Sequence, residues 1–239
     1  MELPGASALV TGAGRGIGRA IAVALGGGGA SVTLVARTKA DLEETARAVR
    51  AAGGRAAVHT GDLRRRADCD AAVAAAVSAH GGLQIVVNNA GIGSHRPVAE
   101  TTDDLWNDVL ETNLGAAFRV TRAALPHLVE RGGHVFMISS LAGQNAIAGM
   151  AAYCASKAAL DHFAACLMLE VRHQGVKVTT IAPGSVDTSF GREPGDARGE
   201  GWMLTARDVA GAVMDLLAVR DGAHLSRVEM RPLRPPKRA

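Results

Sequence analysis

Cysteine, aromatic residues and long apolar runs are all scarce in this chain of 239 residues. Its three cysteines lack the spacing of a metal site or a disulfide framework, which favours a reducing compartment. Aromatic residues make up 3% of the chain and hydrophobic residues 48%, so the core must be built from Ala, Val, Leu and Ile. No run of about 18 apolar residues and no charged-then-apolar N-terminal segment occurs, which predicts a soluble, cytoplasmic protein without a membrane partner.

A large excess of one charge sign is also missing, because the net charge is only +3 at pH 7. This balance suits a phosphorylated small ligand and is too weak to indicate nucleic acid. Residues 64–66 are consecutive arginines, but no aromatic residue interleaves with them, so we interpret the run as a solvated loop. We therefore expect no nucleic-acid partner, and no residue cluster has the spacing of a metal site.

Short apolar runs alternate with helical patterns along the whole chain. We predict strands at residues 7–11, 31–37, 56–60, 83–87, 134–139, 177–181 and 225–230. The alternation predicts an α/β fold in one domain, residues 1–230, with a doubly wound, seven-stranded parallel sheet and helices on both faces. Residues 185–203 lack a pattern and are typical of a substrate-binding loop. Residues 231–239 form a basic, proline-rich tail.

A glycine-rich turn follows the first strand and precedes an apolar helix. Residues 11–18 read Thr-Gly-Ala-Gly-Arg-Gly-Ile-Gly, in which the spacing G-x-G-x-x-G fails because Ile17 takes the third position. The spacing Gly12-x-x-x-Gly16-x-Gly18 fits. Gly12 would permit the turn, Gly16 would let backbone N–H groups approach a pyrophosphate, and Gly18 would let the helix pack close. A plain turn is the alternative.

The end of the second strand predicts the cofactor. Sites for NAD usually carry Asp or Glu there, to hold the 2′-hydroxyl of the ribose. This chain has Ala36 and then Arg37, and Arg15 stands in the glycine turn. Two guanidinium groups match a 2′-phosphate, so we predict NADP(H) as the cofactor. In the alternative reading both arginines are ordinary solvated residues.

Polar residues follow other strands at the edge where ligands of such sheets bind. After the third strand, Asp62 would either accept from the adenine amino group or cap the next helix. After the fourth strand, residues 89–91 would either line the cofactor or form a structural turn. Asn113 lies inside a predicted helix, where asparagine is unfavourable, and this indicates a kink or a polar role.

Tyr153 is the only tyrosine of the chain, and Lys157 follows four residues later on a helical pattern. Residues spaced in this way lie on one face of a helix. The ammonium group would favour the phenolate and lower the pKa of Tyr153 towards the working pH, as a proton donor or acceptor requires. The alternative is a core tyrosine with an exposed lysine nearby.

The order and spacing of these motifs resemble the short-chain dehydrogenase/reductase family over roughly residues 7–219. The resemblance implies a Rossmann fold, a nicotinamide cofactor and a redox reaction between a carbonyl and an alcohol. The residues that carry it are the turn 11–18, the stretch 88–91, Asn113, Ser140, Tyr153, Lys157, Pro183 and Gly184.

The resemblance also implies a role for each matching residue. Tyr153 would be the general acid in reduction and the base in oxidation, and Lys157 would lower its pKa and hold the nicotinamide ribose. Asn113 would support a proton relay through water. The family serine lies thirteen residues before the tyrosine, which selects Ser140 over Ser139 to hydrogen-bond the substrate oxygen. The cofactor would be bound by Gly12, Arg15, Gly16, Ile17, Gly18, Arg37, Asp62, Leu63, Asn89, Ala90, Gly91, Tyr153, Lys157, Pro183, Gly184, Val186 and Thr188.

The resulting interpretation is an NADPH-dependent carbonyl reductase or alcohol dehydrogenase with a small-molecule substrate. Reduction of 3-oxoacyl groups on acyl-carrier protein is the rival, although residues 229–233 depart from the glycine-rich end of those reductases. A catalytically silent NADP-binding sensor is the alternative outside the enzymes. The resemblance further implies a homodimer or homotetramer that forms through the helices at about 102–127 and 151–174.

Overall fold

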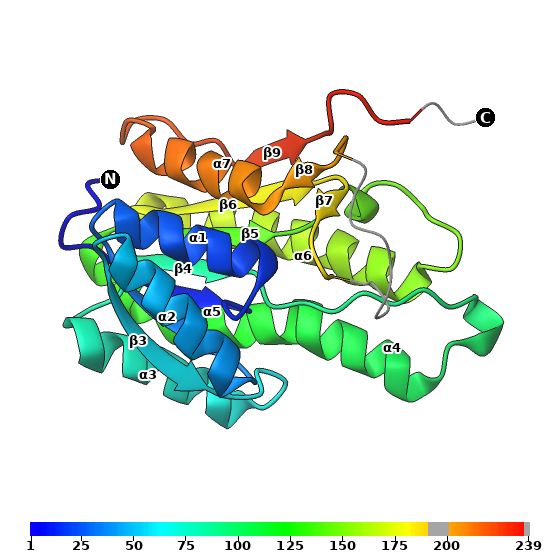
Figure 1. The fold of residues 1–239 in the computed structure, drawn as a ribbon, viewed down its shortest axis with the longest axis horizontal. Helices are drawn as coiled ribbons and strands as arrows, with labels where there is room; N and C mark the ends of the chain where they lie inside the picture. The colour runs from blue at the N-terminus through cyan, green and yellow to red at the C-terminus, as the bar shows by residue number, and fades with distance from the viewer. Residues whose placement is uncertain (191–200, 237–239) are drawn as a thin grey trace.

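A computed structural model describes residues 1–190 and 201–236 of the protein. These residues form a seven-stranded parallel sheet with helices on both faces (Figure 1). Along the sheet the strand order is β3-β2-β1-β4-β5-β6-β9. The bounds are β1 Ser7–Thr11, β2 Ser31–Ala36, β3 Arg55–Thr60, β4 Ile85–Asn88, β5 Gly133–Ile138, β6 Val176–Pro183 and β9 Arg227–Met230. The predicted fold, a single doubly wound α/β domain of the Rossmann type, is confirmed.

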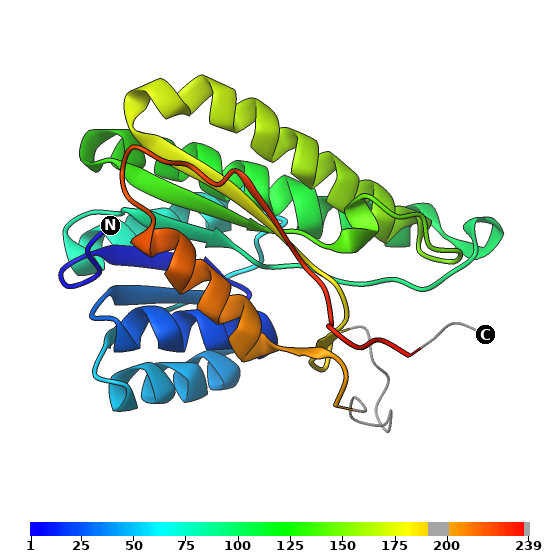
Figure 2. The same ribbon diagram turned by 90° about the horizontal axis from the view of Figure 1, so that it is seen from above.

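Three helices cover each face of the sheet. One face carries α1 Gly16–Gly27, α2 Lys39–Ala51 and α7 Ala206–Ala218, and the other carries α3 Arg66–His80, α5 Ala116–Arg131 and α6 Ala151–Val171. Figure 2 shows the two layers on opposite sides of the sheet. The arrangement follows from right-handed crossover connections between parallel strands.

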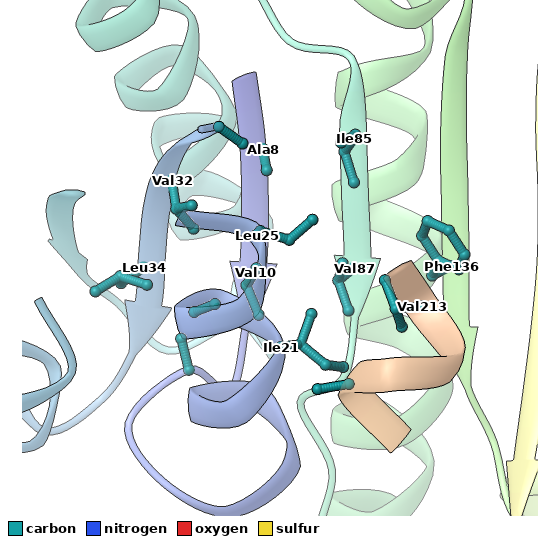
Figure 3. Close-up of a cluster of buried hydrophobic side chains, with 14 of the residues drawn as sticks. Ala8, Val10, Ile21, Leu25, Val32, Leu34, Ile85, Val87, Phe136 and Val213 are labelled. Carbon is teal, nitrogen blue, oxygen red and sulfur yellow. The ribbon is translucent and has the colours of Figure 1, made fainter. Parts of the chain in front are cut away.

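Each face packs its own aliphatic core. Beneath α1, the core contains Val10, Ile21, Leu25 and Val87, all fully buried, with Phe136 as the largest side chain (Figure 3). The second core lies beneath α3, α5 and α6 and is again mostly Ala, Val and Leu. The scarcity of aromatic residues is therefore met by small aliphatic side chains that allow helices to pack close to the sheet.

One predicted helix is interrupted. The helix expected at 102–127 begins as α4 Asp103–Leu110, passes through a π-helical turn, Glu111–Gly115, and continues as α5. Thr102 caps α4, because its side chain accepts from the N–H of Leu105. π-Helical turns are rare and often mark functional sites. Asn113 lies in this turn, where the backbone departs from regular α-helical hydrogen bonding.

The predicted substrate loop, 185–203, is described only at its two ends. There β7 Val186–Asp187 pairs in parallel with β8 Leu204–Thr205, a small ribbon that the sequence did not predict. Thr205 and Asp208 then form a capping box that begins α7. Residues 191–200, and residues 237–239 of the predicted tail, lie outside the described residues.

Within residues 1–190 and 201–236, every helix is too short or too polar to cross a bilayer.

A buried histidine lies on β5, in the middle of the sheet. His134 is 3% exposed, and its Nε2 is 2.8 Å from Thr179 Oγ1. The imidazole stacks on Phe136 with ring centroids 4.0 Å apart. Burial lowers the pKa of His134 to about 3, and the charges of His224 and Lys177 act in the same direction. The fold therefore holds this imidazole in its neutral form.

We expect acid to destabilise the protein through His134. An unfolded histidine binds its proton near pH 6.5, whereas folded His134 binds it only near pH 3. Its contribution to stability is complete above the unfolded pKa and is lost as the pH falls from there towards 3, at about 1.4 kcal/mol per pH unit. Urea unfolding of the parent and of His134→Gln, followed between about pH 6 and pH 4.5, checks this. The variant is expected to show the shallower pH dependence, and equal slopes would contradict the account.

Candidate active site

The carboxyl ends of β1 and β4 are joined by hydrogen bonds. Thr11 Oγ1 accepts from the backbone N–H groups of Asn89 and Ala90, at 2.9 and 3.0 Å. Asn89 Nδ2 donates to the carbonyl oxygens of Thr11 and Gly12, at 3.0 and 3.2 Å. The side chain of Asn89 therefore stabilises the glycine turn, which agrees with the structural alternative for this asparagine.

The glycine spacing has steric causes at two of its positions. Gly12 has φ +63°, and a Cβ there would lie 2.8 Å from Asn89 Nδ2 and 2.9 Å from Ala90 Cα. A Cβ on Gly18 would lie 2.3 Å from the carbonyl oxygen of Gly12. Neither site has room for a side chain, so the predicted turn and close helix packing at these two glycines are confirmed.

The third glycine begins α1. Gly16 has φ +57°, and a Cβ there would be 3.5 Å from the Cγ2 of Thr188. The cap position is Arg15, whose side chain makes no capping bond, so the first N–H groups of α1 are left to a ligand or solvent. An uncapped helix N-terminus favours anions. Thr188 therefore lies close to the N-terminus of α1, the helix end that favours an anion.

Two arginines stand near this helix end. Arg15 and Arg37 are exposed, and neither forms a hydrogen bond or ion pair with any residue in the described part of the chain. Arg19 is different, because its guanidinium donates to the carbonyl oxygen of Gly14 and pairs with Glu44 at 2.7 Å. Arg19 therefore braces the turn, while Arg15 and Arg37 present their charges to solvent.

After β3, Asp62 does not cap the next helix. Its carboxylate accepts from the side chain and the backbone N–H of Arg64. Helix α3 begins at Arg66, and its cap position, Arg65, has no side-chain bond. The capping alternative is therefore wrong. The side chain of Leu63 is buried in the core, so only the backbone of this residue can reach a ligand.

Tyr153 and Ser140 meet beyond the carboxyl end of β5. Tyr153 is 8% exposed, and the Ser140 side chain lies close enough to its hydroxyl to lower the pKa of the phenol. Ser140 Oγ also accepts from the N–H of Ala142 at 3.1 Å, which orients it. Ser139 faces away, because its Oγ donates to the carbonyl oxygen of Lys157 at 3.4 Å. The geometry agrees with the choice of Ser140 over Ser139.

The pKa of Tyr153 differs from the expectation. Burial raises it above the usual value, and the Ser140 side chain opposes this rise. Lys157 is itself buried, at 4% exposed, so the alternative of an exposed lysine is wrong. Its Nζ donates to the carbonyl oxygen of Ile138 at 2.8 Å and lies 5.8 Å from the centre of the Tyr153 ring. Burial also lowers the pKa of Lys157 to about 8, so part of the lysine charge is absent at mildly basic pH.

Asn113 connects three segments with its amide group. Its Oδ1 accepts from the N–H of Ile92 at 2.8 Å, and its Nδ2 donates to the Ile92 carbonyl and to Ser156 Oγ, both at 3.0 Å. A Cβ on Gly91 would lie 3.2 Å from Asn113 Oδ1 and 3.8 Å from Lys157 Nζ. Asn113 therefore has a polar role, one of the two alternatives that the sequence indicated, and it positions the chain after β4.

The residues after β6 lie at the same edge of the sheet as the glycine turn. The Gly184 N–H donates to the carbonyl of Met230 at 2.8 Å, next to Pro183 at the end of β6. Val186 lies in the β7–β8 ribbon, and Thr188 Oγ1 accepts from the N–H of Phe190 at 3.2 Å. The turn 11–18, residues 89–91 and residues 183–188 are thereby brought to one edge of the sheet.

The sequence model of the short chain dehydrogenase family matches residues 6–198. The chain belongs to the short-chain dehydrogenase family. A 3-oxoacyl-[acyl-carrier-protein] reductase of Pseudomonas aeruginosa is 38% identical over 205 residues, which are 84% of this chain and 81% of the relative. A probable oxidoreductase of Mycobacterium tuberculosis is 42% identical over 184 residues, which are 76% of this chain and only 31% of that larger protein.

Solved structures share the whole fold. An alcohol dehydrogenase of Thermococcus sibiricus, complexed with 5-hydroxy-NADP, has a TM-score of 0.90 at 28% identity and covers 98% of this chain and 99% of its own. A short chain dehydrogenase of Mycobacterium paratuberculosis bound to NAD has a TM-score of 0.88 at 28% identity, covering 96% and 97%. The resemblance seen in the sequence is confirmed, and the chain is an oxidoreductase of this family.

This short-chain dehydrogenase also has residues near Tyr153 that the sequence did not single out. The Phe190 ring lies 5.9 Å from the Tyr153 ring, between centroids. Ser156 accepts from Asn113 and donates to the carbonyl of Tyr153 at 2.7 Å. The signal for Phe190 was an aromatic residue inside a polar loop of an aromatic-poor chain. Ser156 had no such signal, because its role depends on a residue 43 positions away.

The described residues contain no group of three or more His, Cys, Asp or Glu side chains that could hold a metal ion.

Proposed function

We propose that this protein is an NADPH-dependent reductase of ketones and aldehydes, which also acts in reverse as an alcohol dehydrogenase. The observation that carries the proposal is the buried phenol of Tyr153, with the Ser140 side chain close to it and Lys157 buried 5.8 Å from its ring centre. A catalytically silent sensor would not need this buried donor pair. Three free thiols support a reducing, cytoplasmic location.

The residues present fit a nicotinamide dinucleotide phosphate. The uncapped start of α1 suits the pyrophosphate, with Gly12 and Gly16 giving backbone access. Arg15 and Arg37 would hold the 2′-phosphate, since each is exposed and without a partner among the described residues. The solved relatives include NADP-type and NAD complexes, so the cofactor preference proposed here rests on the Ala36-Arg37 strand end.

The nicotinamide would supply the hydride that reduces the carbonyl carbon. Ser140 and Tyr153 would donate hydrogen bonds to the carbonyl oxygen, on which negative charge grows during the reaction. Burial raises the pKa of Tyr153, so the phenol carries its proton at neutral pH and can donate it to that oxygen. In oxidation the same phenol, once deprotonated, would accept the proton of the alcohol.

Lys157 would orient the cofactor ribose and stabilise the phenolate that remains after proton donation. Its Nζ uses one donor on Ile138 and has further N–H groups for other partners. Its pKa of about 8 leaves the group mostly charged at neutral pH. The proposed relay through water at Asn113 would use the backbone of the π-helical turn, because both ends of the Asn113 amide are occupied.

Reduction of a 3-oxoacyl thioester is the second candidate function, and the 38% identical Pseudomonas reductase supports it. We expect the protein to reduce small ketones and aldehydes and to leave acetoacetyl thioesters unreduced, with loss of NADPH absorbance as the measurement. The reason is that residues 229–233 depart from the glycine-rich stretch that the resemblance implies for the thioester reductases. A higher kcat/KM for an acetoacetyl thioester than for every small ketone tested would establish thioester reduction as the function.

We also propose a homodimer or homotetramer, for which light scattering is the test. Exposed apolar side chains gather on the helices that the resemblance implicates: Trp106 on α4, Phe118 on α5 and Leu169 on α6. Phe118 and Phe163 form an edge-to-face pair with centroids 6.0 Å apart, which joins α5 to α6. Apolar surface of this kind is typical of an interface.

A further inference from the structure

Arg64 joins the turn after β3 to helix α4. Its Nη2 and Nε donate to the carboxylate of Asp62, at 2.7 and 3.1 Å. Its Nη1 donates to Asp108 Oδ1 on α4 at 2.6 Å. The carbonyl oxygen of Arg64 in turn accepts from Arg119 at 3.2 Å. The guanidinium is thus held in one orientation by two carboxylates, one from the same turn and one 44 residues along the chain.

Asp62 lies next to the arginine proposed to bind the 2′-phosphate. The N–H of Gly61, which follows β3, donates to the carbonyl oxygen of Ala36 at the end of β2, at 3.1 Å. Arg37 and Asp62 are the next residues of these two segments and therefore lie close together. Bonds from Arg64 are the main cause that lowers the pKa of Asp62 to about 2, and the charge of Arg37 adds to it. Asp62 is therefore an anion that both arginines attract.

We propose that Arg64 is a positioning residue that sets cofactor specificity, because it occupies the Asp62 carboxylate and leaves Arg37 available to a 2′-phosphate. The inference rests on the proposed NADP(H) function. Without Arg64, Asp62 would pair with Arg37 and would repel a phosphate dianion. A guanidinium group binds either a carboxylate or a phosphate through the same two N–H groups, so the two pairings compete.

Stability is not an adequate explanation for this ion pair. The side chains of Arg64 and Asp62 are 38% and 24% exposed, and pairs at such sites contribute little to folding. Their placement beside Arg37 has a clear effect on ligand binding instead, because it determines which charge faces the cofactor. The anchor on Asp108 keeps Arg64 on its side of Asp62.

The test measures the dissociation constants of NADP⁺ and NAD⁺ by calorimetry, for the parent and for Arg64→Gln. The ratio of the two constants cancels any effect common to both cofactors, such as loss of an adenine contact. We expect Arg64→Gln to reduce the preference for NADP⁺ by about tenfold. The double variant Asp62→Asn/Arg64→Gln should restore the parental ratio, because the competing carboxylate is gone.

Arg65→Gln is the matched control. It removes the same charge at the next residue, and the side chain of Arg65 pairs with Asp68 instead of Asp62. It should leave the ratio unchanged. An unchanged ratio of the two constants in Arg64→Gln overturns the role of Arg64 but leaves the proposed cofactor standing. An equal fall of the ratio in Arg64→Gln and Arg65→Gln has the same meaning. A double variant as weak as Arg64→Gln would mean that Arg64 contacts the phosphate itself, which also overturns it. A parent without preference for NADP⁺ overturns the proposed cofactor and this inference together.

Discussion

Replacing Tyr153 with phenylalanine is expected to lower kcat for ketone reduction by about a thousandfold, while the dissociation constant for NADPH should stay close to the parental value. The phenol is the only one in the chain, and its raised pKa keeps the proton available for transfer. Phenylalanine retains the ring that packs against Phe190, so the fold around the site is preserved. Steady-state kinetics with NADPH, together with a binding titration, give both quantities.

Two further variants separate proton donation from hydrogen bonding. Ser140→Ala removes one donor to the substrate oxygen and is expected to lower kcat by about a hundredfold. Ser139→Ala is its control, because Ser139 faces Lys157 and not Tyr153, and it should reduce ketones at nearly the parental rate. If Tyr153→Phe reduced ketones as fast as the parent, the proposed mechanism would be wrong.

Replacing Arg37 with aspartate is expected to reverse the cofactor preference. The change removes a guanidinium group that faces solvent at the end of β2 and places there a carboxylate that accepts from a ribose 2′-hydroxyl and repels a 2′-phosphate. We expect kcat/KM with NADPH to fall by about a hundredfold and kcat/KM with NADH to rise. Initial rates with each cofactor at saturating ketone provide the comparison.

Arg15→Gln serves as a partial version of the same change, because Arg15 is the second exposed guanidinium near α1. It should weaken NADPH less than Arg37→Asp and should not improve NADH, since it adds no carboxylate. Unchanged cofactor preference in Arg37→Asp would show that Arg37 does not touch the 2′-phosphate. In that case the Arg64 inference would fail as well.

Local signals were enough for much of the site. The spacing of Gly12 and Gly18 was readable in the chain because both belong to one turn, although each also contacts Asn89 at the distant end of β4. Tyr153 and Lys157 lie on one helix, and their relative position follows from helix geometry. Ser140 was selected by a fixed distance along the chain, and the structure brings it to Tyr153.

Other features depended on contacts between distant residues. The sequence suggested that Lys157 lowers the pKa of Tyr153, but burial of both side chains outweighs that effect. Asp62 was equally consistent with a helix cap, and only the position of Arg64 decided against it. Asparagine is unusual inside a helix, so the sequence singled out Asn113. Its hydrogen-bond partner Ile92 is 21 residues away, and the sequence could not identify it.

The sequence by itself determined the parallel sheet and the glycine turn at α1 and singled out the residues proposed to carry the chemistry, because these depend on periodicity and on spacing along the chain. The tertiary structure alone decided how those residues are tuned. The pKa of Tyr153 depends on how completely the fold buries it, and the orientation of Arg64 depends on Asp108, 44 residues along the chain. Burial and long-range pairing are set by how helices pack on the sheet, and no local pattern encodes them.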